Sequence, residues 1–285
     1  MLIINMEEQN GAVYFCATST KSKEAYSEVF EDYASISNPC FTGALNDQDL
    51  RWENKSNEKM ENFHLLKFKD DQMIFASTAP VSEFKSKFKA SGKGASPYKG
   101  NKFSISRFFV TADEEFLIAG QLTGHAVIKS GYGALGNTPT GTYMKTYLDI
   151  ICMHFDKNGG LKAQYGVERL NDDKKSEIFD IGQNFHLGSD KKTLYWELLE
   201  VKGAKGYAGF MDAMNGSLTY YPLYFPRIAK IDLSGASVGD FTVLGNQKFY
   251  LRKNFRGLFD EKENSITYVG HDEDYKKLWV GKYSF

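Results

Sequence analysis

The sequence predicts an all-β protein built from repeated hairpin units. Apolar and polar residues alternate along short segments on either side of tight turns, a period-two pattern typical of half-buried strands. The chain contains 22 Phe and 17 Tyr, which suit a pleated surface, and 26 Gly, which suit many turns. Equivalent hairpins recur about every 75 residues, and such a fixed spacing indicates an array of similar units.

Seven hairpins and a final single strand can be placed along the chain. Their turns contain Asn, Asp or Gly, which tolerate turn backbone. The turns lie at 9–11, 70–71, 112–114, 156–159, 190–191, 232–235 and 260–264, and the last strand covers 276–285. The fourth and sixth turns share the patterns Asp156-x-x-Gly159 and Asp232-x-x-Gly235. There we expect the Asp to bond its own turn and the Gly to adopt a positive φ.

Two hairpins per repeat supply four antiparallel strands, the content of one propeller blade. We therefore predict a single propeller-like domain over 1–285, an array of four-stranded antiparallel blades. The blades are expected at about 1–82, 103–170, 176–250 and 251–285. The last contains only three strands, so we expect residues upstream of Met1 to complete the ring. The alternative is a pair of packed β-sandwiches.

Through its D-x-x-G turns the chain resembles bacterial β-propeller repeat proteins of the kelch-like kind. The resemblance covers most of the chain and implies a propeller fold. It points to no characterised family, and the WD dipeptide of another propeller family is absent.

The amino-acid composition and net charge limit the classes of partner that the protein is expected to bind. The net charge of −1 creates no global field that would attract nucleic acid or anionic lipid. One basic segment, 85–107, interleaves lysines with aromatic residues, and we interpret it as a solvated edge and not as a nucleic-acid site. No apolar run is long enough for a membrane span. The sequence does not predict the oligomeric state.

Cysteine spacing and the N-terminus give further expectations. Cys16 and Cys152 lie within apolar strand patterns and are predicted to be buried thiols, with a Cys16–Cys40 disulfide as the alternative. No close Cys/His spacing indicates a metal, and no cofactor is predicted. The N-terminus lacks the pattern of a secretory signal. We expect a periplasmic or cell-surface protein if a signal was removed, and a cytoplasmic one otherwise.

The candidate binding face is predicted from the long connections between the two hairpins of each unit. These cover about 19–62, 123–146 and 202–226 and should emerge on one face, where insertions often mark a binding surface. The Gly-rich and aromatic loops are the candidates, although both could simply pack over the blades. The predicted ligand-binding residues are His125, Lys129, Tyr132, Tyr207, Asp212, Tyr220, Tyr221 and Arg227.

No catalytic motif is recognised in the sequence. The leading hypothesis is therefore a binding or scaffold module that presents these loops to a glycan, a peptide or a protein. The alternative is a polysaccharide hydrolase or lyase on a propeller scaffold. That alternative requires at least two carboxylates within about 10 Å in one pocket.

Overall fold

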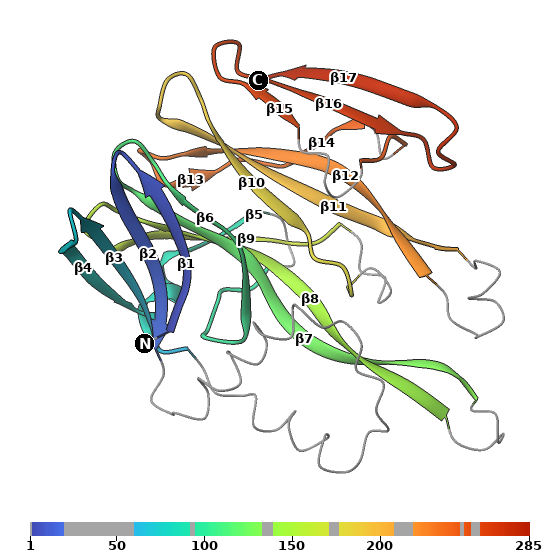
Figure 1. Cartoon of the computed structure of the whole chain (residues 1–285), viewed down its shortest axis with the longest axis horizontal. Coiled ribbons are helices and arrows are strands. Elements are labelled where there is room, and N and C mark those ends of the chain that lie inside the picture. The colour runs from blue at the N-terminus through green and yellow to red at the C-terminus, as the bar shows by residue number, and fades with distance from the viewer. Residues whose placement is uncertain are drawn as a thin grey trace.

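The computed structural model describes residues 2–19, 60–91, 95–132, 139–170, 177–207, 219–245, 248–251 and 257–285. Within these residues the chain forms four β-sheets, mostly antiparallel, and one short 3₁₀ helix, so the predicted all-β class is confirmed. The sheets follow one another in chain order, from β1–β4 at one end to β15–β17 at the other (Figure 1). The described residues form no closed ring.

The first two sheets contain nine strands. The first is a meander of β1 (Leu2–Gln9), β2 (Ala12–Ser19), β3 (Asn62–Lys69) and β4 (Gln72–Pro80). The helix η2 (Val81–Lys87) follows β4. The second sheet contains β6 (Phe103–Val110), β7 (Phe116–Tyr132), β8 (Pro139–Phe155), β9 (Leu161–Val167) and β5 (Phe88–Ser91). β5, which the sequence did not predict, pairs in parallel with β9.

The last two sheets contain the remaining strands. The third is formed by β10 (Gly182–Leu187), β11 (Thr193–Tyr207), β12 (Thr219–Asp232), β13 (Ser237–Val238) and β14 (Thr242–Val243). The fourth is formed by β15 (Leu258–Asp260), β16 (Ser265–His271) and β17 (Leu278–Ser284). Its strand order is β15-β16-β17.

The tight turns use the residues that their backbone requires. Asn10 and Gly11 have φ values of 53° and 71°, and Asp70 and Asp71 have 49° and 59°. Two successive positive φ values are the signature of the type I′ hairpin turn, whose twist matches that of the strands.

The two D-x-x-G turns are not equivalent. In the first, Asp156 Oδ1 accepts hydrogen bonds from two backbone N–H groups and Gly159 has a φ of 76°, as predicted. In the second, Asp232 Oδ1 accepts from Ser234 N, but the positive φ of 45° falls on Ala236. The role predicted for Gly235 is therefore wrong, because this turn reverses the chain one residue later.

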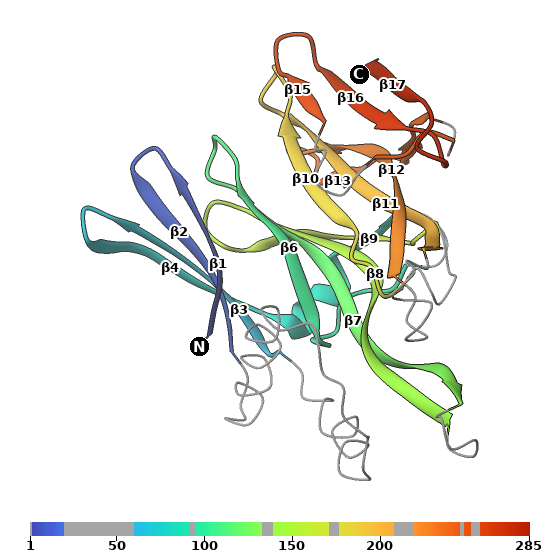
Figure 2. The same cartoon turned by 45° about the vertical axis from the view of Figure 1, so that its right-hand side comes forward.

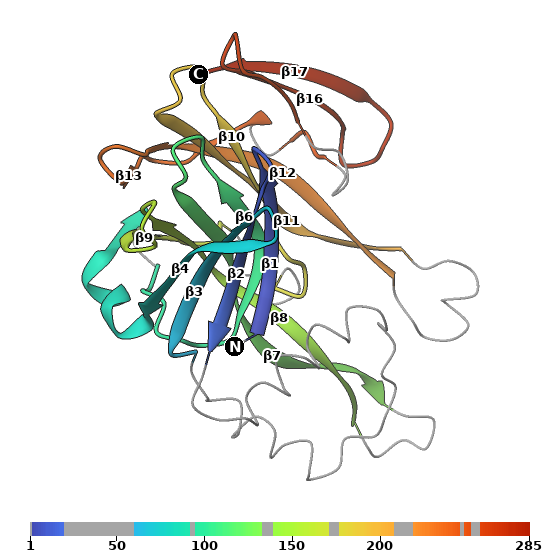
Figure 3. The same cartoon turned by 60° about the vertical axis from the view of Figure 1, so that its left-hand side comes forward.

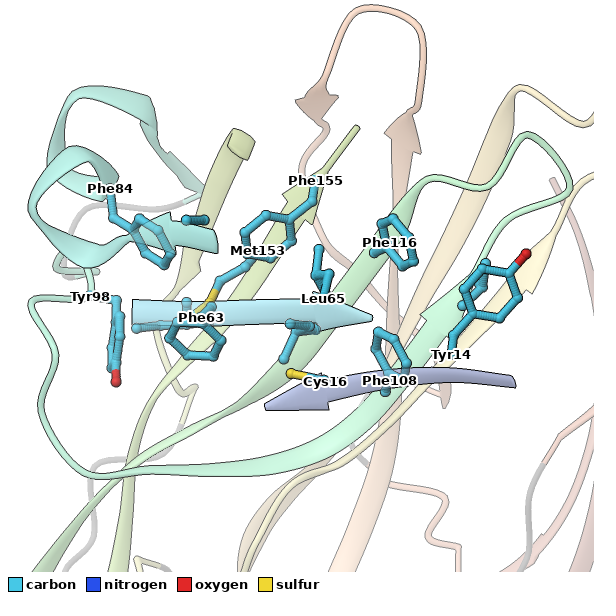
Figure 4. Packing of buried hydrophobic residues seen from close by; sticks show 14 of the residues in the cluster. Tyr14, Cys16, Phe63, Leu65, Phe84, Tyr98, Phe108, Phe116, Met153 and Phe155 are labelled. Atoms are coloured by element: carbon cyan, nitrogen blue, oxygen red, sulfur yellow. The ribbon is translucent and has the colours of Figure 1, made fainter. Parts of the chain in front are cut away.

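Each pair of successive sheets encloses a hydrophobic core. The first–second core is dominated by rings that point toward one another from both sheets and from η2 (Figure 4). The second–third core includes Leu117, Cys152, Tyr165, Trp196 and Ile231. The third–fourth core includes Tyr195, Val201, Tyr224, Ile266 and Tyr268.

Burial on one face or two explains the hydrophobic patterns of the strands. The segment of β7 that starts at Phe116 is continuously apolar because Ile118 faces the first–second core and Leu117 the second–third core. By contrast, β17 alternates regularly, because only one of its faces packs on the third sheet.

Cys16 and Cys152 are buried free thiols, which confirms the sequence prediction for both. Burial raises the pKa of each thiol far above its usual range, so neither side chain is a reactive thiolate. Cys40 lies outside the described residues.

Candidate functional site at the base of two long hairpins

Two hairpins extend well beyond the sheets to which they belong. β7 and β8 are 17 residues each, and β11 and β12 are 15 and 14 residues. Their distal parts project from the same end of the stack, away from the tight turns between β6 and β7 and between β10 and β11 (Figures 1 and 2). This end therefore has a different surface from the end that carries the tight turns.

Most of the predicted ligand-binding residues lie on these projecting strands. His125, Lys129 and Tyr132 belong to β7, where His125 is paired with Lys145 and Lys129 with Gly141. Tyr207 belongs to β11, and Tyr220 and Tyr221 belong to β12. Asp212 lies outside the described residues.

The segments that we interpreted as loops are in large part paired strands. The β7–β8 ladder continues to Tyr132 and Pro139, and the β11–β12 ladder continues to Tyr207 and Thr219. Both ladders cross a register shift before the distal part, at Gln121/Thr123 and at Val201/Gly203. The glycines suggested loops, but the cross-strand hydrogen bonds of a long antiparallel pair do not require a side chain at every position.

Arg227 is the predicted site residue whose side chain the structure describes, and it is buried. Its Nη2 lies 2.8 Å from Glu200 Oε2 and donates a hydrogen bond to the Glu168 carbonyl at 2.6 Å. Its guanidinium group lies 5.0 Å from the centre of the Phe241 ring. These contacts hold the Arg227 side chain in the interior at the base of the second hairpin, and its role in ligand binding stays a prediction.

A second arginine completes this buried cluster. Arg169 follows β9, and its Nε lies 4.0 Å from Glu200 Oε1. Its Nη1 donates to the Tyr147 carbonyl at 2.5 Å, at the base of the first hairpin. Since Glu200 and Arg227 belong to the second hairpin, the Arg169–Glu200–Arg227 cluster connects the bases of both hairpins across the second–third contact.

Burial governs the ionisation of the cluster. Desolvation raises the pKa of Glu200 although the two guanidinium groups act in the opposite direction. Desolvation also lowers the pKa of both Arg169 and Arg227, while the negative charge of Glu200 opposes that shift. A buried charge is tolerated where it is paired, so the three side chains depend on one another for their charged states.

Further carboxylates surround the cluster. Asp149, on β8, is half-buried, and its burial together with the nearby Glu168 raises its pKa above the usual value. Glu177 and Asp180 act electrostatically on Arg169. This part of the hairpin end is therefore rich in acids, and the surroundings of Asp149, like those of Glu200, favour its protonated form.

A pocket opens at the same end of the first sheet, where β3 begins and β4 ends. Its volume is about 590 Å³, and its polar lining includes Glu61, Asn62, Ser82, Lys85 and Lys99. Lys85 comes from η2, whereas Lys99 comes from the segment before β6. The pocket can receive a small polar or anionic group, and one carboxylate, that of Glu61, lines it.

Of the aromatic residues in and beside the basic segment 85–107, Tyr98 is among the residues that line this pocket. Phe84 is buried, and so is the ring of Tyr98, whereas Lys85, Lys87 and Lys99 are exposed. The alternation of lysines and aromatic residues in this segment therefore follows from lysines that face solvent and aromatic rings that face the core. Base stacking requires exposed rings, and whether this segment contacts nucleic acid stays a prediction.

Two other polar clusters are buried, one within the second sheet and one between the third and fourth sheets. His154 Nε2 lies 2.7 Å from Glu115 Oε2, and its Nδ1 lies 3.1 Å from the hydroxyl of Tyr165. In the other cluster, the Tyr268 hydroxyl donates to Glu197 Oε1 at 2.6 Å, which links the third and fourth sheets. Neither cluster contains a Ser, Thr or Cys nucleophile among these partners, so both are interpreted as structural.

Sequence reasoning missed Glu200, Arg169 and Asp149. One signal was present: Glu200 ends the apolar segment TLYWELLE, whose neighbours are buried on both sides. A buried acid inside a strand of this kind requires a hydrogen-bonding or charged partner. The identity of that partner depends on the contact between sheets, and no local pattern contains it.

The fold and site define an all-β protein of four stacked sheets with an elaborated hairpin end. Comparison of the sequence with known protein families and with curated proteins finds no match. In the part of the chain that the structure describes, no helix is long and apolar enough to cross a membrane. The same residues contain no group of three or more His, Cys, Asp or Glu placed to hold a metal ion.

Proposed function

We propose that this protein is a binding module whose contact surface is the hairpin end of the stack. This surface comprises the distal parts of β7–β8 and β11–β12 and the pocket lined by Lys85 and Lys99. Its partner is a glycan, a peptide or another protein. The observation that carries the proposal is that two hairpins from different sheets project at the same end and share one buried ionic support.

The buried ionic cluster at the bases of the two hairpins favours a binding role for the hairpin end. Burial of the Arg169–Glu200–Arg227 cluster costs desolvation energy, so its presence is weak evidence for stability, and we infer that it fixes the geometry of the two hairpins instead. Paired strands also lose less entropy on binding than free loops, which improves affinity. The sequence places Tyr at positions 207, 220 and 221 of the second hairpin, and tyrosine is a residue type that provides contact area at low entropic cost.

The stack itself is proposed to be part of a propeller-like ring. In support, the first three sheets contain at least four strands, β1–β4, β6–β9 and β10–β13 occur as meanders, and each sheet packs on the next in chain order. Strand four of one unit connects to strand one of the next on the side of the hairpins.

A polysaccharide hydrolase or lyase is the second candidate, and Asp149 favours it. A carboxyl group whose pKa is raised by burial and by a neighbouring carboxylate, here that of Glu168, has the properties of a general acid. The pocket beside η2 contributes only Glu61 to a pair of carboxylates. The binding module is therefore preferred.

The test compares the protein with the double variant Tyr220→Ala/Tyr221→Ala on a glycan array and a peptide array. Lys157→Ala, an exposed change in the tight turn between β8 and β9, is the matched control. We expect the double variant to lose binding by tenfold or more, about 1.4 kcal/mol, and the control to retain it. Equal binding by all three proteins would show that the hairpin end is not the contact surface.

The enzyme alternative is tested on the ligand that the arrays identify. If that ligand is a polysaccharide, release of reducing ends or unsaturated products is measured for the protein and for Asp149→Asn. Turnover that Asp149→Asn abolishes would establish the enzyme. Binding without turnover would retain the binding module.

A further inference from the structure

A serine and a histidine of the first sheet are hydrogen-bonded to each other. His64 Nε2 lies 2.8 Å from Ser19 Oγ, and His64 Nδ1 lies 3.0 Å from Thr78 Oγ1. Asn62 Nδ2 donates a hydrogen bond to Ser19 Oγ at 3.2 Å. A hydroxyl nucleophile bonded to a base, with the base held by a third group, is the arrangement that nucleophilic catalysis uses.

The strand register brings these side chains together. β2, β3 and β4 lie side by side in the first sheet (Figure 3). Ser19 is paired with Asn62 across β2 and β3. His64, two residues further along β3, is paired with Thr78 of β4. Phe63 points into the first–second core, so its two neighbours on β3 point to the opposite face. Paired strands hold a site more precisely than loops do.

The hydrogen-bonding capacity of the four side chains fits one distribution of protons. An asparagine amide nitrogen only donates, so Ser19 Oγ accepts from Asn62 and keeps its own proton to donate. When His64 carries its proton on Nδ1, that N–H donates to Thr78 Oγ1 and Nε2 accepts the serine proton. Burial lowers the pKa of His64, so the imidazole is neutral at pH 7 and can act as a base.

The Ser19–His64 pair is accessible and lies next to the pocket beside η2. Ser19 and His64 are both partly exposed. Asn62, which contacts Ser19, also lines the pocket of about 590 Å³. This volume lies within the range of pockets that bind small molecules. A substrate in the pocket can therefore place a reacting group close to the serine hydroxyl.

We propose that Ser19 and His64 form the catalytic dyad of a carboxylic ester hydrolase, with part of the ester bound in the pocket. Ser19 Oγ attacks the ester carbonyl carbon while His64 Nε2 takes the hydroxyl proton. Collapse of the tetrahedral intermediate breaks the carbon–oxygen bond to the alcohol, and His64 gives the proton to the leaving oxygen. Water, deprotonated by His64, then attacks the acyl-serine, releases the acid and restores Ser19.

Asn62 and Thr78 assist this reaction in different ways. Asn62 has a second N–H, which can donate to the ester carbonyl oxygen as it gains negative charge. Thr78 is a positioning residue, because its hydroxyl holds the imidazole in the tautomer that presents Nε2 to Ser19. A hydroxyl stabilises the imidazolium less than a carboxylate would. The dyad is therefore assigned to esters and not to amides, whose carbonyl group is less reactive because of resonance with nitrogen.

This inference goes beyond the proposed binding function and does not depend on the two hairpins. The dyad lies on β2 and β3, whereas the hairpins are formed by β7–β8 and β11–β12. Its tests follow a covalent reaction and not ligand capture. Loss of array binding and loss of ester cleavage are therefore separate results.

The first test treats the full chain with a fluorophosphonate probe, which reacts with activated serines, and maps the labelled residue by peptide mass spectrometry. We expect label on Ser19, and none there in His64→Gln, which lacks the base. Ser86, an exposed serine of η2 whose hydroxyl donates to the Glu83 carbonyl, is the internal control and should stay unlabelled. An unlabelled Ser19 in the unaltered chain would overturn the proposal, whatever the variants do.

The second test measures hydrolysis of p-nitrophenyl acetate at pH 7. Ser19→Ala and His64→Gln should each lower kcat/KM by about a hundredfold or more, whereas Ser86→Ala should retain the full rate. Thr78→Val should lower kcat with little change in KM, and Thr78→Ser should recover kcat because it restores the hydroxyl. Absence of turnover by the unaltered chain, or equal turnover by Ser19→Ala, would overturn the proposal.

Discussion

The first–second and second–third contacts hold sheets together by different means. The interior of the first contact is aromatic: Phe116 alone lies against the rings of Tyr14, Phe75 and Phe108, with centres 5.8, 6.0 and 6.3 Å apart. The second contact combines an apolar centre with the buried Arg169–Glu200–Arg227 cluster at the hairpin end. The difference teaches that the first contact supplies stability, whereas the second also fixes where two long hairpins project.

The largest effect is expected in the aromatic contact. Phe116→Ala removes the central ring and leaves a cavity, which should lower the free energy of unfolding by about 4 kcal/mol. Urea denaturation followed by tyrosine and tryptophan fluorescence measures the change. The matched control is Ile74→Ala in the first sheet, where the side chain is 53% exposed and the change should stay within about 0.5 kcal/mol.

The ionic cluster should respond differently to single and combined changes. Arg227→Met leaves buried Glu200 with Arg169 at 4.0 Å as its remaining partner, and should cost about 3 kcal/mol of unfolding free energy. The triple change Arg169→Met/Glu200→Leu/Arg227→Met removes every charge and should recover most of that loss. The same urea experiment compares the two variants. If Arg227→Met has no effect, the cluster does not support the second–third contact.

A smaller effect on stability is expected at Gly120, where the backbones of β6 and β7 approach each other closely on the aromatic side of the second sheet. A Cβ at Gly120 would lie 2.2 Å from the Ser104 carbonyl oxygen and 2.8 Å from the Phe103 ring. Gly120→Ala should therefore displace β6 from β7 and cost about 2 kcal/mol, measured by thermal unfolding. Gly239→Ala meets only the Lys230 carbonyl oxygen at 3.7 Å and should be nearly neutral.

The smallest effect concerns pH and the polar side of the second–third contact. Burial lowers the pKa of His154, although the hydrogen bond to Glu115 acts in the opposite direction. A histidine with a lowered folded pKa contributes stability above its unfolded pKa of about 6.5, and that stability is lost as pH falls through the folded pKa. We expect unfolding free energy to fall below pH 6.5, and His154→Gln to reduce that slope. An identical pH dependence of the unfolding free energy in both proteins would show that His154 does not cause the loss of stability.

The sequence was sufficient for the strands and turns. Period-two alternation located the hairpins around Gln9–Gly11 and Asp70–Asp71 because strand spacing and turn chemistry are local properties. It failed for β5, whose four residues form a parallel pair with β9 from a distant part of the chain. It also treated the distal parts of β7–β8 as loops, because glycines mark turns more often than paired strands.

Within the candidate site, the sequence did not predict that Arg227 is buried. Arg227 was predicted to face a ligand, yet it faces Glu200 in the interior. The side of a strand on which Arg227 lies follows from alternation, but the presence of another sheet on that side does not. The carboxylates around Arg169 come from separate segments and meet only through sheet stacking.

The sequence by itself determined an all-β protein, its hairpins, and the burial of Cys16 and Cys152, because these depend on local patterns of polarity. Only the tertiary structure decided that Glu200 is paired with Arg169 and Arg227 and that a pocket adjoins η2. The physical reason is that desolvation and charge pairing depend on which surfaces meet. These contacts join residues that are far apart in the chain, and no local sequence pattern predicts them.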